Sequence, residues 1–193
     1  MRFSSDWFYG GKVQSAPEVK DRSVLDFDIP MLWIDTADMN CREEFVGESY
    51  GRINKTEAQL TLAALQLYFD KIGKERVLSE RIDVGIISPY RAQVQHLRRL
   101  IRHSSYMKPL KHLITVNTVD GFQGQERDVI IISLVRANET GEIGFLRDLR
   151  RMNVAMTRAR MKLIIIGNAD TLSHHPFYKK LYEYVQSLPS NNS

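Results

Sequence analysis

The sequence predicts an α/β fold, a three-layer arrangement in which a parallel sheet lies between helices on both faces. Three observations lead to this prediction. Short apolar runs alternate along the chain with segments whose apolar residues recur at helical spacing. Two of these runs, at residues 129–132 and 163–166, are wholly apolar, as is typical of strands that are covered on both faces. Strands that helices separate pair in parallel, because the connections between them are crossovers.

The N-terminal segment is expected to form an aromatic anchor, a turn and then a strand. The expected anchor consists of the aromatic residues Phe3, Trp7, Phe8 and Tyr9. Gly10 and Gly11 follow and are typical of a turn. Residues 31–35 form a short apolar run that predicts a buried strand, and the polar residues 38–51 predict a loop.

A helix is predicted over about residues 55–70. Asn54 and Glu57 have the spacing of a capping box, in which the N-cap side chain and a carboxylate three residues later bond to each other's backbone N–H groups. Apolar residues at helical spacing follow, so we expect this helix to be amphipathic.

Strands and helices alternate in the rest of the chain. The predicted strands cover residues 82–88, 113–117, 128–135 and 162–166. The predicted helices cover residues 92–103, 148–159 and 177–187. Asp148 caps the second of these helices, and Pro176 lies in the first turn of the third. Because ligands bind at the carboxyl ends of the strands in such sheets, we expect a site in the loops after Ser88, Asn117 and Gly167.

Length and composition indicate one intracellular domain over residues 1–193, with residues 188–193 as a frayed tail. The single Cys41 cannot form an internal disulfide, which favours a reducing, cytoplasmic compartment. The apolar runs fall far short of the ~20 residues that span a bilayer, and no signal peptide is recognisable, so membrane and secreted classes are excluded. Residues 61–193 carry 20 basic and 12 acidic side chains, which favours a polyanionic partner such as nucleic acid.

Residues 118–126 form the first segment that can carry chemistry. Gly124 and a second glycine let the backbone approach a phosphate or a ribose closely. Thr118 offers a hydroxyl and a backbone N–H to a phosphate oxygen, Gln123 can donate and accept, and an ionised Glu126 accepts from sugar hydroxyls. The alternative is a polar turn with a glycine bulge.

Residues 147–162 form the second segment and carry six basic side chains and one acidic one. On a helix, Arg151 and Arg158 lie seven residues apart, two turns along one face. An arginine that a helix aims at the carboxyl edge of a sheet can act as an arginine finger on a γ-phosphate. The alternative is a basic, solvated helix. No metal site is expected, because the adjacent His174 and His175 have no carboxylate or cysteine partners nearby.

Taken together, the two segments strongly resemble motifs V and VI of superfamily 1 helicases, in the branch of the up-frameshift RNA-surveillance helicases and the replication helicase–nucleases. Motif V is matched by TVDGFQGQERDVIIIS at residues 118–133, and motif VI by RRMNVAMTRAR at residues 150–160. Two further segments agree, GIISPYRAQ at residues 85–93 and NKTE at residues 54–57. The four segments occur in the same order as in the family, and the resemblance extends over nearly the whole chain.

The resemblance implies a RecA-like fold, the fold of P-loop nucleotide hydrolases, without a phosphate loop of its own. It implies that Glu126 binds the ribose of ATP and that Arg158 is the arginine finger. Gln123 and Gly124 match the motif V loop that links the nucleotide state to the grip on the strand.

The resemblance also implies contacts with the backbone of single-stranded DNA or RNA. The residues that match these contacts are Thr118, Ser88, Pro89 and Tyr90. Supporting roles, including the orientation of the motif VI helix, fall to Asp120, Arg151 and Asn153.

A helicase core also needs a Gly-x-x-x-x-Gly-Lys-[Ser/Thr] loop to hold the phosphates and Mg²⁺, and this sequence has none. Asp35 ends a strand that superficially resembles a Walker B strand. We therefore expect the second RecA-like domain of a longer ATP-dependent helicase, inactive alone, with ATP and Mg²⁺ bound mainly by a first RecA-like domain. The alternatives are a non-catalytic nucleic-acid-binding or regulatory module with this fold, and an arginine finger that acts on the ATP of another chain.

Overall fold

The computed structural model describes residue 3, residues 30–47 and residues 51–189. The expected turn at Gly10 and Gly11, the aromatic residues before it other than Phe3, and residues 190–193 of the expected tail lie outside these residues. Phe3 itself is buried and packs against the rings of Phe177 and Tyr184, with centroids 5.5 and 5.4 Å away. This contact agrees with the anchor role that the sequence predicts for Phe3.

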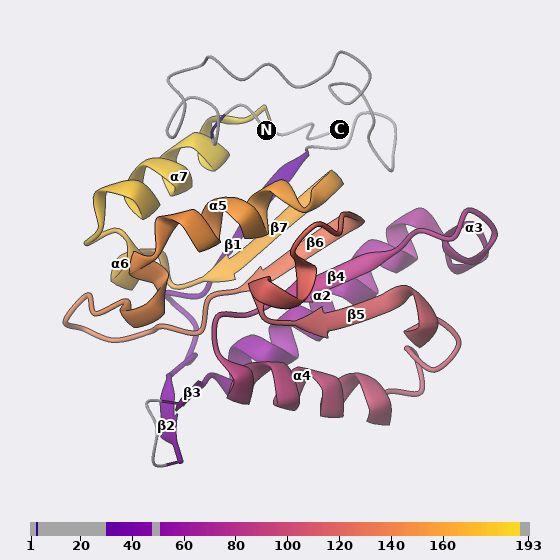
Figure 1. The fold of residues 1–193 in the computed structure, drawn as a ribbon, viewed down its shortest axis with the longest axis horizontal. Coiled ribbons are helices and arrows are strands. Elements are labelled where there is room, and N and C mark those ends of the chain that lie inside the picture. The colour runs from indigo at the N-terminus through magenta and orange to yellow at the C-terminus, as the bar shows by residue number, and fades with distance from the viewer. Residues whose placement is uncertain (1–2, 4–29, 48–50, 190–193) are drawn as a thin grey trace.

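A five-stranded, fully parallel sheet forms the middle layer, as predicted (Figure 1). The strands are β1 (Met31–Asp35), β4 (Val84–Ile87), β5 (Ile114–Asn117), β6 (Arg127–Ser133) and β7 (Ala159–Gly167). They lie in the order β1-β7-β6-β4-β5, and each neighbouring pair is parallel. The carboxyl ends of all five strands therefore meet at one edge of the sheet and the amino ends at the opposite edge.

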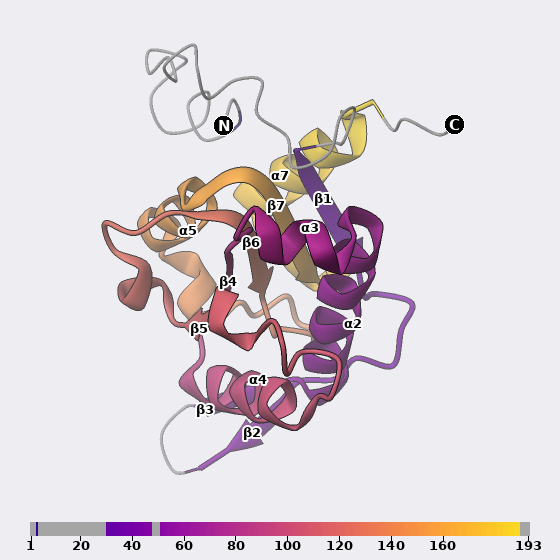
Figure 2. The same ribbon diagram turned by 90° about the vertical axis from the view of Figure 1, so that its right-hand side faces the viewer.

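Helices cover both faces of this sheet (Figures 1 and 2). One face is covered by α2 (Lys55–Ile72), α3 (Lys74–Ser79) and α4 (Arg91–His103). The other is covered by α5 (Leu149–Thr157), α6 (Ala169–Leu172) and α7 (Pro176–Ser187). Strand β6 shows why its apolar run is unbroken: Val129 and Ile131 pack on the α2 side, and Ile130 and Ile132 on the α5 side. Alternate side chains thus enter two separate cores.

Helix α2 starts as predicted, but only half of its predicted capping box forms. The Asn54 side chain accepts a hydrogen bond from the Glu57 backbone N–H at 3.0 Å. The Glu57 carboxylate does not return to the Asn54 N–H, which donates instead to Gln93. It turns inward and accepts from the Ser133 hydroxyl at 2.6 Å and from the Val135 backbone N–H at 2.7 Å. The reciprocal half of the capping box is therefore a wrong prediction.

A hairpin replaces part of the loop that the sequence predicts over residues 38–51. Its strands are β2 (Glu44–Val46) and β3 (Gly51–Ile53), which pair antiparallel and extend away from the main sheet (Figure 1). Three-residue strands are too short to show a clear alternation of apolar and polar residues, so the pattern gives no signal. Gly47 has φ +76°, a conformation that favours glycine.

Short 3₁₀ turns complete the connections and place the functional segments. They are η2 (Lys111–Leu113), η3 (Val119–Phe122) and η4 (Gly144–Arg147). Asp148 caps α5 as predicted, because its carboxylate accepts from the Arg151 backbone N–H at 3.2 Å. Within the described residues, no helix combines the length and the apolar character needed to cross a membrane.

Candidate functional site

Two segments cross the molecule from one edge of the sheet to the other. Thr118 directly follows the last residue of β5 at the carboxyl edge, and Glu126 directly precedes the first residue of β6 at the amino edge. Helix α5 makes the same crossing, because Asp148 precedes it and Arg158 joins its end to the first residue of β7. Each segment therefore carries functional candidates at both edges.

Glu126 and Arg158 are neighbours at the amino edge. The Arg127 backbone N–H donates to the Arg158 carbonyl oxygen at 2.9 Å, and Arg127 pairs with Ala159 in the ladder between β6 and β7. The sequence prediction that Arg158 points at the carboxyl edge is wrong, because α5 runs back from the carboxyl edge to the amino edge. Arg158 nevertheless lies at the same edge as Glu126, because both residues directly precede neighbouring strands.

Neither side chain at this edge forms an ion pair within the part of the chain that the structure describes. Glu126 is exposed. Arg158 is half-buried and uses Nε to donate to the Val154 carbonyl at 3.2 Å and Nη2 to donate to the Thr157 hydroxyl at 3.4 Å. Neutral acceptors thus orient the guanidinium while its charge stays uncompensated.

Other arginines of the same basic segment are neutralised by carboxylates. Arg160 lies 3.0 Å from both Asp83 and Asp128. Arg151 lies 3.6 Å from Asp120 and 3.5 Å from Asp148. Arg158 therefore differs from these two arginines. It also differs from the exposed Arg147 and Arg150, which form no ion pair among the described residues either, because its guanidinium is half-buried and oriented by hydrogen bonds. An anion from outside this segment can pair with it.

The loop between the two edges depends on its glycines. Gly124 has φ +72°, where a side chain would be strained. A Cβ at Gly121 would collide with the side chain of Asn117. Gln123 and Gly124 are both exposed, so the loop offers polar groups to solvent or to a ligand.

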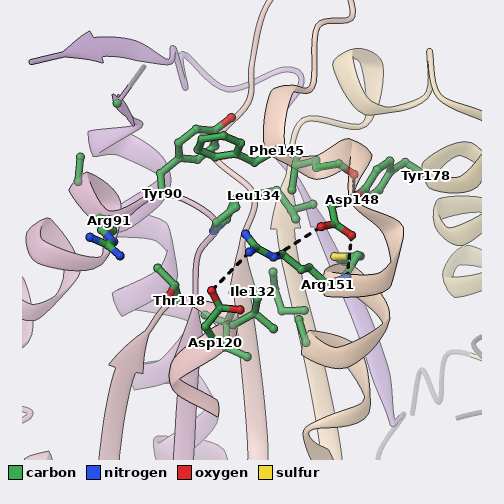
Figure 3. Close-up of a pocket in the computed structure, with 18 residues that line it drawn as sticks. Tyr90, Arg91, Thr118, Asp120, Ile132, Leu134, Phe145, Asp148, Arg151 and Tyr178 are labelled. Atoms are coloured by element: carbon green, nitrogen blue, oxygen red, sulfur yellow. Dashed lines mark hydrogen bonds and ion pairs between the residues drawn. The ribbon is translucent and has the colours of Figure 1, made fainter. Parts of the chain in front are cut away.

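A cavity of about 400 Å³ opens at the carboxyl edge (Figure 3). Its apolar lining comes from the ends of central strands and from α5, and includes Ile87, Ile132, Leu134, Met152 and Ala155. Its polar lining comes from the loops after β4 and β5 and from α5, and includes Arg91, Thr118, Asp120, Asp148 and Arg151. Tyr90, Phe145 and Tyr178 add aromatic rings. The cavity thus combines an apolar lining with charged groups.

Most of the residues predicted to contact nucleic acid lie at this cavity. Thr118, Pro89 and Tyr90 line it, in the loops after β4 and β5 where the sequence placed a site. Ser88 differs: its side chain is fully buried and is not part of the lining. The loop after Gly167 also contributes nothing to the lining.

The three residues predicted to have supporting roles divide between two places. Asp120 and Arg151 line the cavity and connect η3 to α5 through their ion pair. Asn153 lies outside the lining on α5, half-buried, and its Oδ1 has no hydrogen-bond partner within the described residues. No group of three or more metal-binding side chains is present among the described residues.

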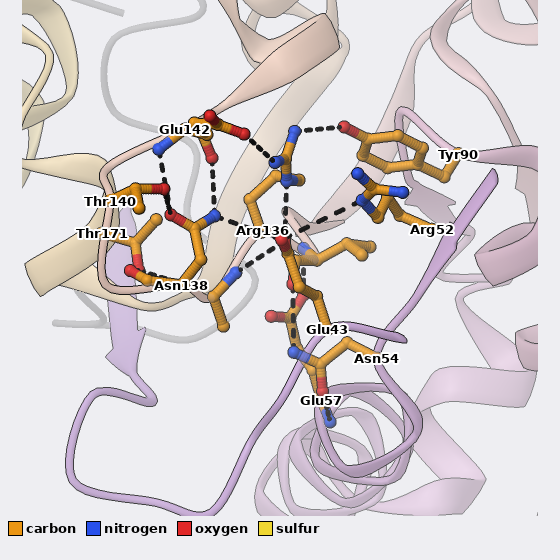
Figure 4. A network of polar contacts seen from close by, with 12 residues as sticks. Glu43, Arg52, Asn54, Glu57, Tyr90, Arg136, Asn138, Thr140, Glu142 and Thr171 are labelled. Atoms are coloured by element: carbon orange, nitrogen blue, oxygen red, sulfur yellow. Dashed lines mark hydrogen bonds and ion pairs between the residues drawn. The ribbon is translucent and has the colours of Figure 1, made fainter. Parts of the chain in front are cut away.

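A buried polar network behind the cavity was not predicted (Figure 4). Arg136 donates from Nε to Glu43 at 2.6 Å and from Nη1 to the Tyr90 hydroxyl at 3.2 Å. Although burial opposes its charged form, the hydrogen bonds to Glu43 and Tyr90 leave the pKa of Arg136 raised. Glu57 lies deeper, and burial raises the pKa of its carboxyl to about 7. Arg136 and Glu43 are 93 residues apart, so no local pattern links them.

Comparisons with known proteins agree with these motifs. The family model of the AAA domain matches residues 1–170. DNA polymerase alpha-associated DNA helicase A of Saccharomyces cerevisiae is 36% identical over 191 residues, which cover 89% of this chain and 26% of that protein. The Regulator of nonsense transcripts 1 homolog of Drosophila melanogaster is 36% identical over 192 residues, which cover 96% and 16%.

A third relative is named for DNA binding and not for helicase activity. DNA-binding protein SMUBP-2 of Rattus norvegicus is 32% identical over 193 residues, which cover 95% of this chain and 18% of that protein. The chain therefore spans between 16% and 26% of the length of these three curated relatives.

Proposed function

This chain belongs to the AAA domain family and is a relative of superfamily 1 helicases, and from that premise we propose that it is the second RecA-like domain of an ATP-dependent DNA or RNA helicase. The observation that carries the proposal is the pair of side chains at the amino edge. Glu126 and Arg158 come from two different motifs, lie on adjacent strand starts, and have no ion-pair partner among the described residues.

The residues at this edge fit part of a nucleotide. An exposed carboxylate accepts hydrogen bonds from sugar hydroxyls, which is the role we give Glu126. A guanidinium with uncompensated charge stabilises the charge that develops on a γ-phosphate during transfer, which is the role we give Arg158. The sequence has no phosphate loop, so a first RecA-like domain holds the phosphates and the Mg²⁺.

The carboxyl edge takes the single strand. Thr118 presents a hydroxyl at the cavity, and Arg91 presents a cation at the start of α4. Within the described residues Arg91 forms no ion pair, so it is available to a phosphate. Contacts of this kind are independent of sequence and weaken as the salt concentration rises.

The two edges communicate through the segments that cross between them. Residues 118–126 connect Thr118 at the strand site to Glu126 at the nucleotide site, with Gln123 and Gly124 between them. Helix α5 connects Arg151 to Arg158, about 10 Å along a helix axis. A shift at one edge can therefore be transmitted to the other along these segments, and the exposed ion pair between Arg151 and Asp120 adds a weak contact between them.

The test is ATP turnover by the purified 193-residue chain and by the full-length helicase. The chain alone is expected to show no turnover and a weak, salt-sensitive affinity for single strands, whereas the full-length protein hydrolyses ATP. Turnover by the chain alone that Arg158→Ala abolishes would overturn the second-domain assignment. A full-length protein that binds strands but neither binds nor hydrolyses ATP would favour the non-catalytic module instead.

A further inference from the structure

Phe145 is an exposed aromatic residue at the mouth of the carboxyl-edge cavity. It lies on η4, and 56% of its surface is exposed. One face of its ring stacks on Tyr90, with centroids 5.2 Å apart and 29° between the ring planes (Figure 3). A large apolar side chain that is held at a cavity in this way is a feature of binding sites.

The ring beneath Phe145 is fixed in place. Tyr90 is 3% exposed, and its hydroxyl accepts from Arg136, which is itself 4% exposed and ion-paired with Glu43 (Figure 4). The backbone before Phe145 is also constrained. Gly144 has φ +51°, and a Cβ there would collide with the Arg136 guanidinium and lie 2.8 Å from the Tyr90 hydroxyl. The two stacked rings therefore form a preorganised surface.

The charges around the cavity limit what phosphate contacts alone can do. Arg151 is shared between Asp120 and Asp148. Arg91 remains as the lining cation without a carboxylate partner among the described residues. One free cation is a weak basis for holding a polyanion, whereas the apolar lining and the exposed ring suit an aromatic group that is attached to a phosphate.

We propose that the exposed face of Phe145 stacks on a base of the bound single strand, with Tyr90 as the second layer of the platform. This inference rests on the proposed function, because it places the strand at the carboxyl edge. Stacking on an aromatic ring does not distinguish the four bases, so the contact adds affinity without sequence preference.

The experiment compares two strands of equal length and charge, an oligothymidylate and an abasic oligomer, by fluorescence anisotropy with the 193-residue chain. Phe145→Ala is expected to weaken binding of the oligothymidylate by roughly tenfold, because a base–aromatic stack contributes that order of affinity, and to leave the abasic strand unaffected. Phe145→Trp is expected to restore the oligothymidylate affinity. Since the side chain is mostly exposed, neither variant should disturb folding, which circular dichroism checks.

Phe45→Ala is the matched control. Phe45 is similarly exposed, at 59%, but lies on the β2–β3 hairpin and is not part of the cavity lining. The Phe45→Ala variant is expected to bind the oligothymidylate and the abasic strand with unchanged affinity. An equal loss from both phenylalanine variants would overturn the proposal, because it would show a general apolar effect.

Arg91→Gln separates this inference from the proposed function. If Arg91→Gln weakens both strands while Phe145→Ala weakens neither, the strand is held by its phosphates at this edge and the stacking proposal is wrong, but the strand site stands. If the wild-type chain binds neither strand at any salt concentration, the nucleic-acid part of the proposed function fails, and the stacking proposal fails with it.

Discussion

The two edges of the sheet differ in how complete they are. At the carboxyl edge, a cavity is enclosed by this chain's own residues, and a buried network holds its aromatic wall. At the amino edge, Glu126 and Arg158 stand without ion-pair partners among the described residues. The difference teaches that unpaired charged groups can mark a site that is only partly built by one chain. Under the proposed function, we expect the carboxyl edge to bind its ligand alone and the amino edge to need another domain.

The largest expected effect is a loss of ATP turnover when Arg158 at the amino edge is replaced. In the full-length helicase, Arg158→Ala should lower ATP turnover by a factor on the order of 10³, because the charge that develops on the γ-phosphate loses its guanidinium. ATP binding and single-strand affinity should change little. Steady-state turnover and equilibrium nucleotide binding measure the two effects separately.

Arg150→Ala is the control for that prediction. Arg150 is exposed on the same helix, and the structure gives it no ion pair within the described residues. A comparable loss of turnover in this variant would show that the basic charge of α5 matters as a whole, and the special role of Arg158 would be lost.

The next largest effect is the loss of stability when the buried network behind the carboxyl-edge cavity is broken. Arg136→Ala removes the close cation of the partly buried Glu43, which keeps only Arg52 at 4.0 Å, and should lower the free energy of unfolding by about 3 kcal/mol. The exposed pair between Arg76 and Glu80 gives the comparison, since Arg76→Ala should cost about 0.5 kcal/mol or less. Urea denaturation of the chain measures both, and equal losses would contradict the view that Arg136 anchors the cavity wall.

Glu57 provides a pH-dependent test of the same region. Burial raises the pKa of Glu57 to about 7, from an ordinary value of 4.5. Between these values the folded state holds a proton that the unfolded state has released. The stability that this gives is fully present below about pH 4.5 and is lost as the pH rises through 7, a change on the order of 3 kcal/mol.

The Glu57→Gln variant cannot titrate at this position and should lose that part of the pH dependence. The readout is the difference in unfolding free energy between wild type and variant, measured by urea denaturation at pH values between about 4.5 and 7. Parallel pH profiles for the two proteins would show that Glu57 releases its proton over the same pH range in the folded and unfolded states, so that folding does not raise its pKa.

The smallest expected effect is the coupling free energy between the two segments that connect the edges. Arg151 and Asp120 form an exposed ion pair, so their coupling in a double-mutant cycle with Arg151→Gln and Asp120→Asn should be about 0.5 kcal/mol or less and should fall with added salt. A coupling of several kcal/mol would show that the two segments move as one rigid unit.

The parts of the fold that sequence reasoning predicts are those with a local physical cause. The apolar runs of β6 and β7 are unbroken because helices cover both faces of the sheet. Consecutive residues of these strands are therefore all apolar, and the sequence shows this directly. The caps at Asn54 and Asp148 are also local, since each side chain bonds to a backbone N–H three residues on. The motifs at residues 118–126 and 150–160 contain candidate residues that the structure brings to the two edges, although the sequence did not assign Arg158 to the correct edge.

The missed features depend on residues that are distant in sequence. Glu57 meets Ser133 and Val135 across 76 and 78 residues, so its spacing from Asn54 suggested the wrong partner. Arg158 is different, because the topology does fix its edge: a helix that connects two parallel strands runs back from the carboxyl edge to the amino edge, so the end of α5 before β7 lies at the amino edge. Phe145 lies in a single 3₁₀ turn, where a lone aromatic residue gives no pattern.

The central claim is that the two edges bind different ligands, and the most direct test is ATP turnover by the full-length helicase as a function of single-strand concentration. Arg158→Ala should abolish turnover at every strand concentration, whereas Phe145→Ala should reach the wild-type maximum but require roughly tenfold more strand. If Phe145→Ala lowers the maximum while Arg158→Ala shifts only the strand requirement, the assignment of the two edges is contradicted.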